Sequence, residues 1–87
     1  MADEARARER HLDGIAPRRA QLWIQVEKLV ATTKPANYAE ALMLLLDLRD
    51  LSARRTERDD FRARLAALKR THAAKPAFLS RLRRAGL

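Results

Sequence analysis

The stretch from Asn37 to Arg54 constrains the fold of this chain more than any other. It reads NYAEALMLLLDLRDLSAR, has no Gly or Pro, and carries two apolar rows at helical spacing that together cover most of a helix circumference. Only a narrow polar line remains, formed by Glu40, Asp47 and Arg54. A helix that is apolar nearly all round is buried on several sides, so we predict a central helix with the others packed around it. The alternative is one helix of a coiled-coil oligomer, whereas a membrane span would need about 20 apolar residues.

Apolar stripes at helical spacing recur along the rest of the chain. The connections between them are short, so successive helices are expected to run antiparallel. Residues 1–14 have almost no apolar face and end in Asp13-Gly14, so they are expected to form a flexible or frayed N-terminal arm. We predict one all-α domain over 15–87, a small antiparallel helical bundle with three main helices and a short C-terminal helix. The predicted helices are 17–32, 37–54, 57–73 and 76–85.

Local signals mark the expected helix ends and the expected core. Asn37 with Glu40, and Thr56 with Asp59, match the capping-box pattern at a helix N-terminus. Gly86 is expected to take the left-handed conformation that ends the last helix. The apolar rows predict a core of Leu22, Val26, Leu29, Tyr38, Leu42, Leu45, Leu48, Phe61, Leu65, Leu68, Phe78 and Leu82.

Composition narrows the chemistry. The chain of 87 residues has no Cys, so it can form neither a disulfide nor a thiolate metal site. His11 and His72 are its only His residues. Neither Ser52 nor Ser80 has a His or an acidic residue at a spacing typical of a catalytic nucleophile and its base. Two separated Gly residues cannot make a Gly-rich phosphate loop. We therefore expect a protein that is not an enzyme and has no cofactor or metal, and, with no secretory signal, a cytoplasmic one.

Positive charge is concentrated in the second half of the chain. Residues 51–87 hold eleven Lys and Arg against three acidic residues, whereas charges cancel in residues 1–50. A one-sided basic field favours an anionic partner: nucleic acid, an acidic protein surface or anionic lipid. Fifteen of the nineteen basic residues are Arg, however, and a high-GC coding bias would give the same excess without any ligand. The candidate anion or nucleic-acid surface consists of Arg54, Arg55, Arg58, Arg62, Lys69, Arg81, Arg83 and Arg84.

Trp23 is the candidate anchor for a protein partner. It lies beside the apolar stripe of its helix, where core packing is the simpler interpretation. Trp is also enriched among the residues that dominate the binding energy of protein interfaces. A half-exposed Trp23 would therefore suit contact with a partner protein or a second copy of the chain.

Three stretches resemble a known family. LWIQVEKLVATTKPANYAEALMLLLDLRDLSARR (22–55), FRARLAALKRTHAAKPAFL (61–79) and RLRRAGL (81–87) are similar to the C-terminal helical region of bacterial, especially actinobacterial, SWIM zinc-finger proteins. The resemblance implies an all-helical accessory module. The finger itself needs Cys-x-Cys and Cys-x-His, which this chain lacks, so zinc binding does not carry over. Residues 37–42, Asn-Tyr-Ala-Glu-Ala-Leu, also look like the start of a tetratricopeptide-type (TPR-like) helix, and such helices usually hold protein partners.

Two functions follow as hypotheses. The first is a non-catalytic helical protein–protein interaction module that can self-associate as a homodimer and is accessory to a larger or zinc-finger-bearing system. The second is a basic nucleic-acid-binding accessory domain that contacts phosphates through its C-terminal half, without reading sequence.

Overall fold

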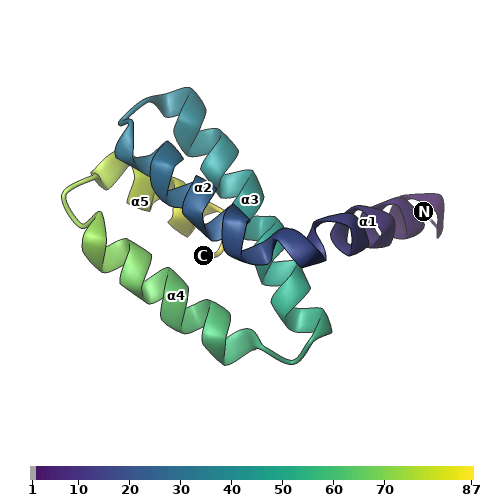
Figure 1. Ribbon diagram of the computed structural model, residues 1–87. Helices are drawn as coiled ribbons and strands as arrows, with labels where there is room; N and C mark the ends of the chain where they lie inside the picture. Colours follow the sequence, from purple (N-terminus) through teal and green to yellow (C-terminus); the bar gives the residue numbers. More distant parts are fainter. Residues whose placement is uncertain (1) are drawn as a thin grey trace.

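The computed structural model describes residues 2–87, and every regular element in that range is helical (Figure 1). The predicted all-α bundle of three main helices and a short C-terminal helix is confirmed, with one further helix at the N-terminus. The elements are α1 (Ala2–Ile15), a 3-10 turn η1 (Ala16–Arg18), α2 (Arg19–Ala31), α3 (Pro35–Arg54), α4 (Arg58–Thr71) and α5 (Pro76–Arg84).

Helix α3 is the central element of the bundle. It contacts α1, α2, α4 and α5, and the side chains of Ala41 and Leu45 have no exposed surface. In Figure 1, α2 runs antiparallel beside the first half of α3, and α4 turns back from its C-terminal end and diverges from it. The all-round apolar pattern of this stretch is therefore explained by packing on several sides. Among residues 2–87, no helix combines the length and apolarity needed to cross a membrane.

The core follows the predicted rows with small differences at their edges. All the predicted core residues are buried except Leu29 and Leu42, which are half-buried and pack against the cluster. Val30, Ala41 and Leu51 are buried although they were not among those predicted. Val30 lies one helical turn after the buried Val26, on the same face of α2. Val30 is therefore buried in place of the neighbouring Leu29, which is half-buried.

Helix α3 begins at Pro35, so the predicted N-terminal cap at Asn37 was wrong. Lys34 is extended, at φ −104° and ψ 130°, as expected before a Pro, and its carbonyl accepts the N–H of Tyr38 at 3.0 Å. Pro35 is already suited to the first helical position, because its fixed φ is helical and its missing N–H needs no partner there. The Asn37 amide instead donates to Oγ1 of Thr32 at 2.7 Å.

The predicted cap at Thr56 was also wrong, because Thr56 ends α3 rather than starting α4. Its φ of 56° is left-handed, and the N–H of Glu57 donates to the carbonyl of Ser52 at 2.8 Å. These are features of a C-terminal Schellman turn. Helix α4 then starts at Arg58 without a side-chain cap.

Gly86 ends α5 as predicted. Its φ is 80°. Its N–H donates to the carbonyl of Arg83 at 3.1 Å, and the N–H of Leu87 donates to the carbonyl of Leu82 at 2.8 Å. Both Schellman hydrogen bonds are therefore present. The turn directs Leu87 back onto the core.

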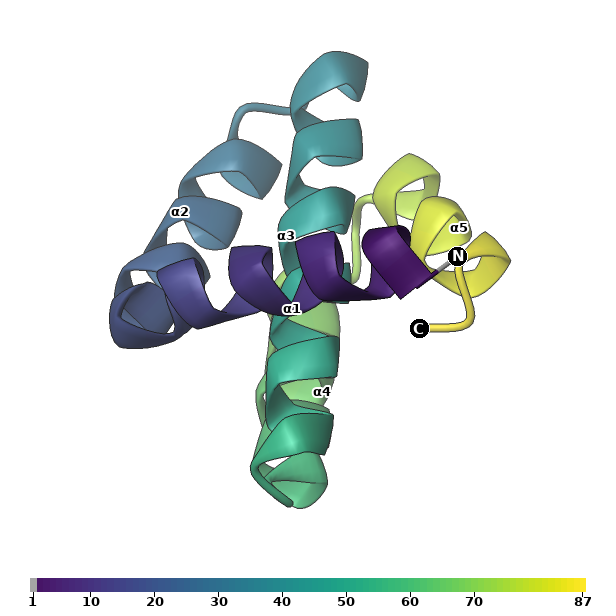
Figure 2. The ribbon, with the colours of Figure 1, turned by 90° about the vertical axis from the view of Figure 1, so that its right-hand side faces the viewer.

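The N-terminal segment differs from the expected arm. Asp13-Gly14 does not end the helix, since α1 continues to Ile15. Leu12 is buried, with 4% of its surface exposed. Figure 2 shows α1 crossing α3. The last turns of α1 thus belong to the folded domain, and the boundary predicted at residue 14 falls inside a continuous helix.

Replacing Leu45 with Asp should unfold the domain. The side chain has no exposed surface, and an unpaired carboxylate there costs several kcal/mol, comparable with the total stability of a small domain. The measurement is thermal unfolding followed by circular dichroism. Met43→Asp is the matched control on the same helix, because Met43 is 68% exposed and should tolerate the charge. Equal melting curves for both variants would contradict the central position of α3.

Candidate functional site

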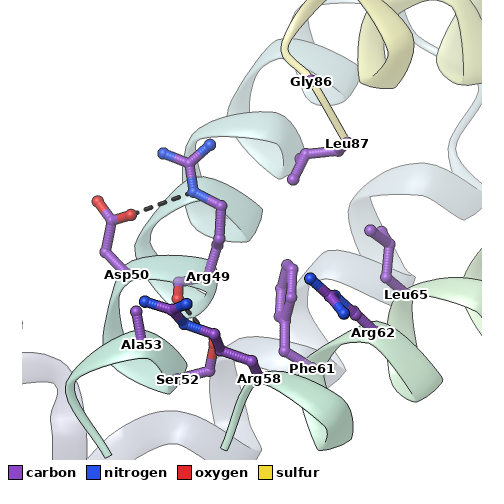
Figure 3. A pocket seen from close by; sticks show the side chains of 10 residues that line it. All are labelled: Arg49, Asp50, Ser52, Ala53, Arg58, Phe61, Arg62, Leu65, Gly86 and Leu87. Carbon is purple, nitrogen blue, oxygen red and sulfur yellow. Dashed lines mark hydrogen bonds and ion pairs between the residues drawn. The ribbon is translucent and has the colours of Figure 1, made fainter. Parts of the chain in front are cut away.

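The candidate site is an open groove between the C-terminal half of α3 and the N-terminal half of α4. Its volume is about 450 Å³, within the range of ligand-sized pockets, and Figure 3 shows its lining side chains. The short turn after α3 places the two helices as its walls, and the C-terminal turn closes one end. The lining residues are Arg49, Asp50, Ser52, Ala53, Arg58, Phe61, Arg62, Leu65, Gly86 and Leu87.

The floor of this groove is apolar. Phe61 and Leu65 present the small exposed parts of core side chains, 7% each, and Ala53 faces them from α3. Leu87 is held over the groove by the turn at the end of α5, and Nζ of Lys69 donates to the Leu87 carbonyl at 2.5 Å. A predicted member of the anion surface, Lys69, therefore positions a wall of the groove.

The rim is basic. Arg58 and Arg62 lie one helical turn apart on α4, are exposed, and form no ion pair with any residue in 2–87. Arg49 lies on the opposite wall, where its Nε donates to Asp50 at 3.1 Å. Figure 3 shows the Arg58 and Arg62 side chains beside Phe61 and the Arg49–Asp50 pair across from them. The site thus combines an apolar floor with two guanidinium groups that lack an internal counter-ion.

Two acidic residues of α3, Asp47 and Asp50, bind side chains of α1. Arg8 donates to Asp47 at 2.6 Å and to Asp50 at 2.7 Å, and His11 lies 2.9 Å from Asp47. Partial burial alone would raise the pKa of Asp50, but hydrogen bonds from Arg8 and Arg49 outweigh it and hold that pKa below its ordinary value. Hydrogen bonds to the two carboxylates raise the pKa of Arg8, and the bond to Asp50 has a larger effect than the bond to Asp47.

The remaining predicted basic residues do not join the groove. Arg54 pairs with Asp13 of α1 at 2.5 Å, and Arg55 lies beside it in a separate hollow. Arg81 is half-buried on α5, whereas Arg83 and Arg84 are exposed in its last turn. Of the eight candidates, Arg58 and Arg62 line the α3–α4 groove, and Arg54 and Arg55 line the separate hollow beside α1.

Trp23 lies in a different, shallower hollow between α2 and α4. The Trp23 ring is half-buried, 5.8 Å from the ring of Phe61, and Cζ of Arg64 is 5.8 Å from its centroid. Ile24, beside it, is 56% exposed. Much of Trp23 is thus used in packing, and its role as a partner anchor stays a prediction.

His72 has a structural environment. It is buried at the end of α4, with Nε2 2.8 Å from a carboxylate oxygen of Glu27 and its ring edge-on to Phe78 at 6.4 Å. Nearby, Nζ of Lys75 donates to the last-turn carbonyl of Val30 at 2.7 Å. These contacts join the α4–α5 turn to α2. No group of three or more potential metal ligands occurs within residues 2–87.

Phe61 and Leu65 were predicted only as core residues, and Arg49, Ala53 and Leu87 were missed as site residues. The available signal was the α3–α4 hairpin, because residues equally far from its turn face each other. Arg49 and Arg62 form one such pair, and Ala53 and Arg58 form another. Comparison with protein-family models, with curated proteins and with solved structures finds no match to this chain.

Removing the carboxylates that bind Arg8 should loosen α1 selectively. Asp47→Asn with Asp50→Asn should speed hydrogen exchange of α1 amides while α2–α5 stay protected, because α1 is attached mainly by ion pairs and Leu12. Strong salt should act in the same direction. Glu40→Gln is the control, since Glu40 is an exposed α3 carboxylate without an ion pair in residues 2–87.

Acid should have the same effect as these substitutions. Because the pKa of Asp50 is lower in the folded chain than its ordinary value of 3.8, its stabilising contribution is complete above that value. The contribution disappears as the pH falls through the folded-state pKa. Unchanged α1 protection in the double variant and in acid would show that packing alone holds α1.

Proposed function

We propose that this domain is a non-catalytic helical module that binds a partner protein through the α3–α4 groove. The observation that carries the proposal is the combination of an apolar floor, formed by Phe61 and Leu65, with the exposed basic rim of Arg58 and Arg62. Protein interfaces characteristically join an apolar centre to a polar rim, and Arg is enriched in them. A resemblance to helical regions of SWIM zinc-finger proteins fits a module that is accessory to a larger or zinc-finger-bearing system.

Nucleic-acid binding is the competing function, and one observation favours it: Arg58, Arg62, Arg83 and Arg84 are all exposed. Phosphate contacts would need only this charge. One observation supports the protein partner instead. Arg54 and Lys69 are engaged within the fold, which leaves fewer of the candidate basic residues available for phosphates.

A photo-reactive benzoylphenylalanine at Ala53 should identify the class of partner directly. Ala53 lies on the groove wall and is half-exposed, so an occupant of the groove would be within reach of the probe. Irradiation in the cells that produce the protein should give adducts that proteases shorten and nucleases do not. The same probe at Arg70, exposed on α4 outside the groove, is the control.

Other outcomes of the cross-linking are decisive against the proposal. Adducts sensitive to nuclease would support nucleic-acid binding. Adducts formed equally at both positions would show that the groove has no special role. An adduct of twice the chain mass, together with a dimer in light scattering, would identify a second copy as the occupant.

A further inference from the structure

We infer that the occupant of the α3–α4 groove is a short acidic, amphipathic segment of the partner protein, with carboxylates on the two rim arginines and an apolar anchor on the floor. This inference rests on the proposed function and adds to it the chemistry of the partner. It follows from three features of the groove: the charge of its rim, the pairing of two neighbouring acids with other arginines, and its dimensions.

The rim carries charge that the fold does not compensate. Arg58 and Arg62 are at positions i and i+4 of α4, where like charges repel and lower helix stability. No carboxylate within residues 2–87 pairs with either of them. An anion from outside would relieve this repulsion and could accept hydrogen bonds from both guanidinium groups.

Two of the carboxylates near the rim are paired with other arginines. Asp50, the acid lining the groove, accepts hydrogen bonds from Arg8 and Arg49. Asp60 of α4 lies 3.3 Å from Arg64 and 3.9 Å from Arg19. Asp59, next to Arg58, is exposed and forms no ion pair in residues 2–87. Neither rim arginine is therefore paired with a carboxylate, and an acidic ligand would supply the charge complement.

The floor and size of the groove define the rest of the ligand. Phe61, Leu65 and Leu87 are apolar, so a small inorganic anion or a bare phosphate would leave them uncovered. The α4 wall from Arg58 to Leu65 is about 11 Å long, or roughly two helical turns of a ligand lying beside it. A segment with an apolar residue next to carboxylates one turn apart matches both the floor and the rim.

The test is a selection from a displayed library of random peptides of about 12 residues, long enough for roughly three helical turns. Selection on the folded domain should enrich peptides with two or more Asp or Glu and a large apolar residue within one turn of them. Selection on Arg58→Glu/Arg62→Glu should reverse the preference and enrich Lys and Arg. Arg70→Glu is the control, because it reverses one charge on the same helix outside the groove. Selection on this variant should still enrich acidic peptides.

The affinities of the selected peptides for the unmodified domain and for its variants test the inference quantitatively. An acidic peptide should bind Arg58→Gln/Arg62→Gln at least about tenfold more weakly than the unmodified domain, since hydrogen bonds between charged groups are lost. The Gln variant also covers the case in which the Glu reversal fails to fold, which circular dichroism would show. Replacing Glu with Gln in the peptide should cause a similar loss.

The outcomes separate this inference from the proposed function. Selection of neutral apolar peptides, with their affinity unchanged in the Gln variant, would overturn the acidic partner but keep a protein-binding groove. No enrichment of any peptide, together with binding of duplex DNA that Arg58→Gln/Arg62→Gln abolishes, would overturn both. Acidic peptides bound equally by all variants would place their site elsewhere and overturn the inference.

Discussion

The structure depends on the need to bury α3 on nearly every side. Ala41 and Leu45 have no exposed surface, and Leu48 and Leu51 are buried as well. No single neighbouring helix could cover all of these side chains, because they are spread along and around α3. The chain meets this requirement with α2, α4 and α5, while α1 crosses the remaining polar line. The positions of α2, α4 and α5 around α3 follow from this constraint.

The groove is a consequence of how α3 and α4 are joined. The left-handed turn at Thr56 brings α4 back beside α3, and the two helices then diverge. Phe61 and Leu65 fill the core side of the junction but leave part of their surface accessible. The end of α5 supplies Leu87 to this partly filled space, with Lys69 holding it in position.

The distribution of ion pairs explains why the rim stays basic. Asp47 and Asp50 belong to the polar side of α3 and are bound by Arg8 of α1, so attachment of the N-terminal helix uses acids that lie on or near the groove. The net charge of +8 leaves too few acids to pair every arginine. Arg58 and Arg62 are left uncompensated where the apolar floor is accessible, and that coincidence gives the groove its proposed specificity.

Most of the fold could be predicted from the sequence, because the apolar rows of α2, α3 and α4 are long and regular. The errors occur where two local signals compete. Pro35 and Asn37 both suit a helix start, and the fixed φ of Pro35 prevailed. Thr56 looked like a cap, but its position after α3 required a left-handed residue. Leu12 alone gave no apolar row, so the docking of α1 through ion pairs could not be seen.

The site was less predictable than the fold. Charge counting identified Arg58 and Arg62 but also Arg54 and Lys69, which have partners inside the structure. Separating these two groups requires knowing which carboxylates and carbonyl groups lie within reach in three dimensions. Sequence spacing reports that only for residues on the same helix.

The most direct test of this account is the free energy of unfolding of Arg58→Gln/Arg62→Gln, measured by urea denaturation. Gln keeps part of the aliphatic stem, so the change removes charge with little loss of packing. If the two arginines have no partner within the fold, stability should be unchanged within about 0.5 kcal/mol, or slightly higher because their repulsion is removed. A loss of more than about 1 kcal/mol would show that they stabilise the domain itself, and would contradict a rim kept free for an acidic partner.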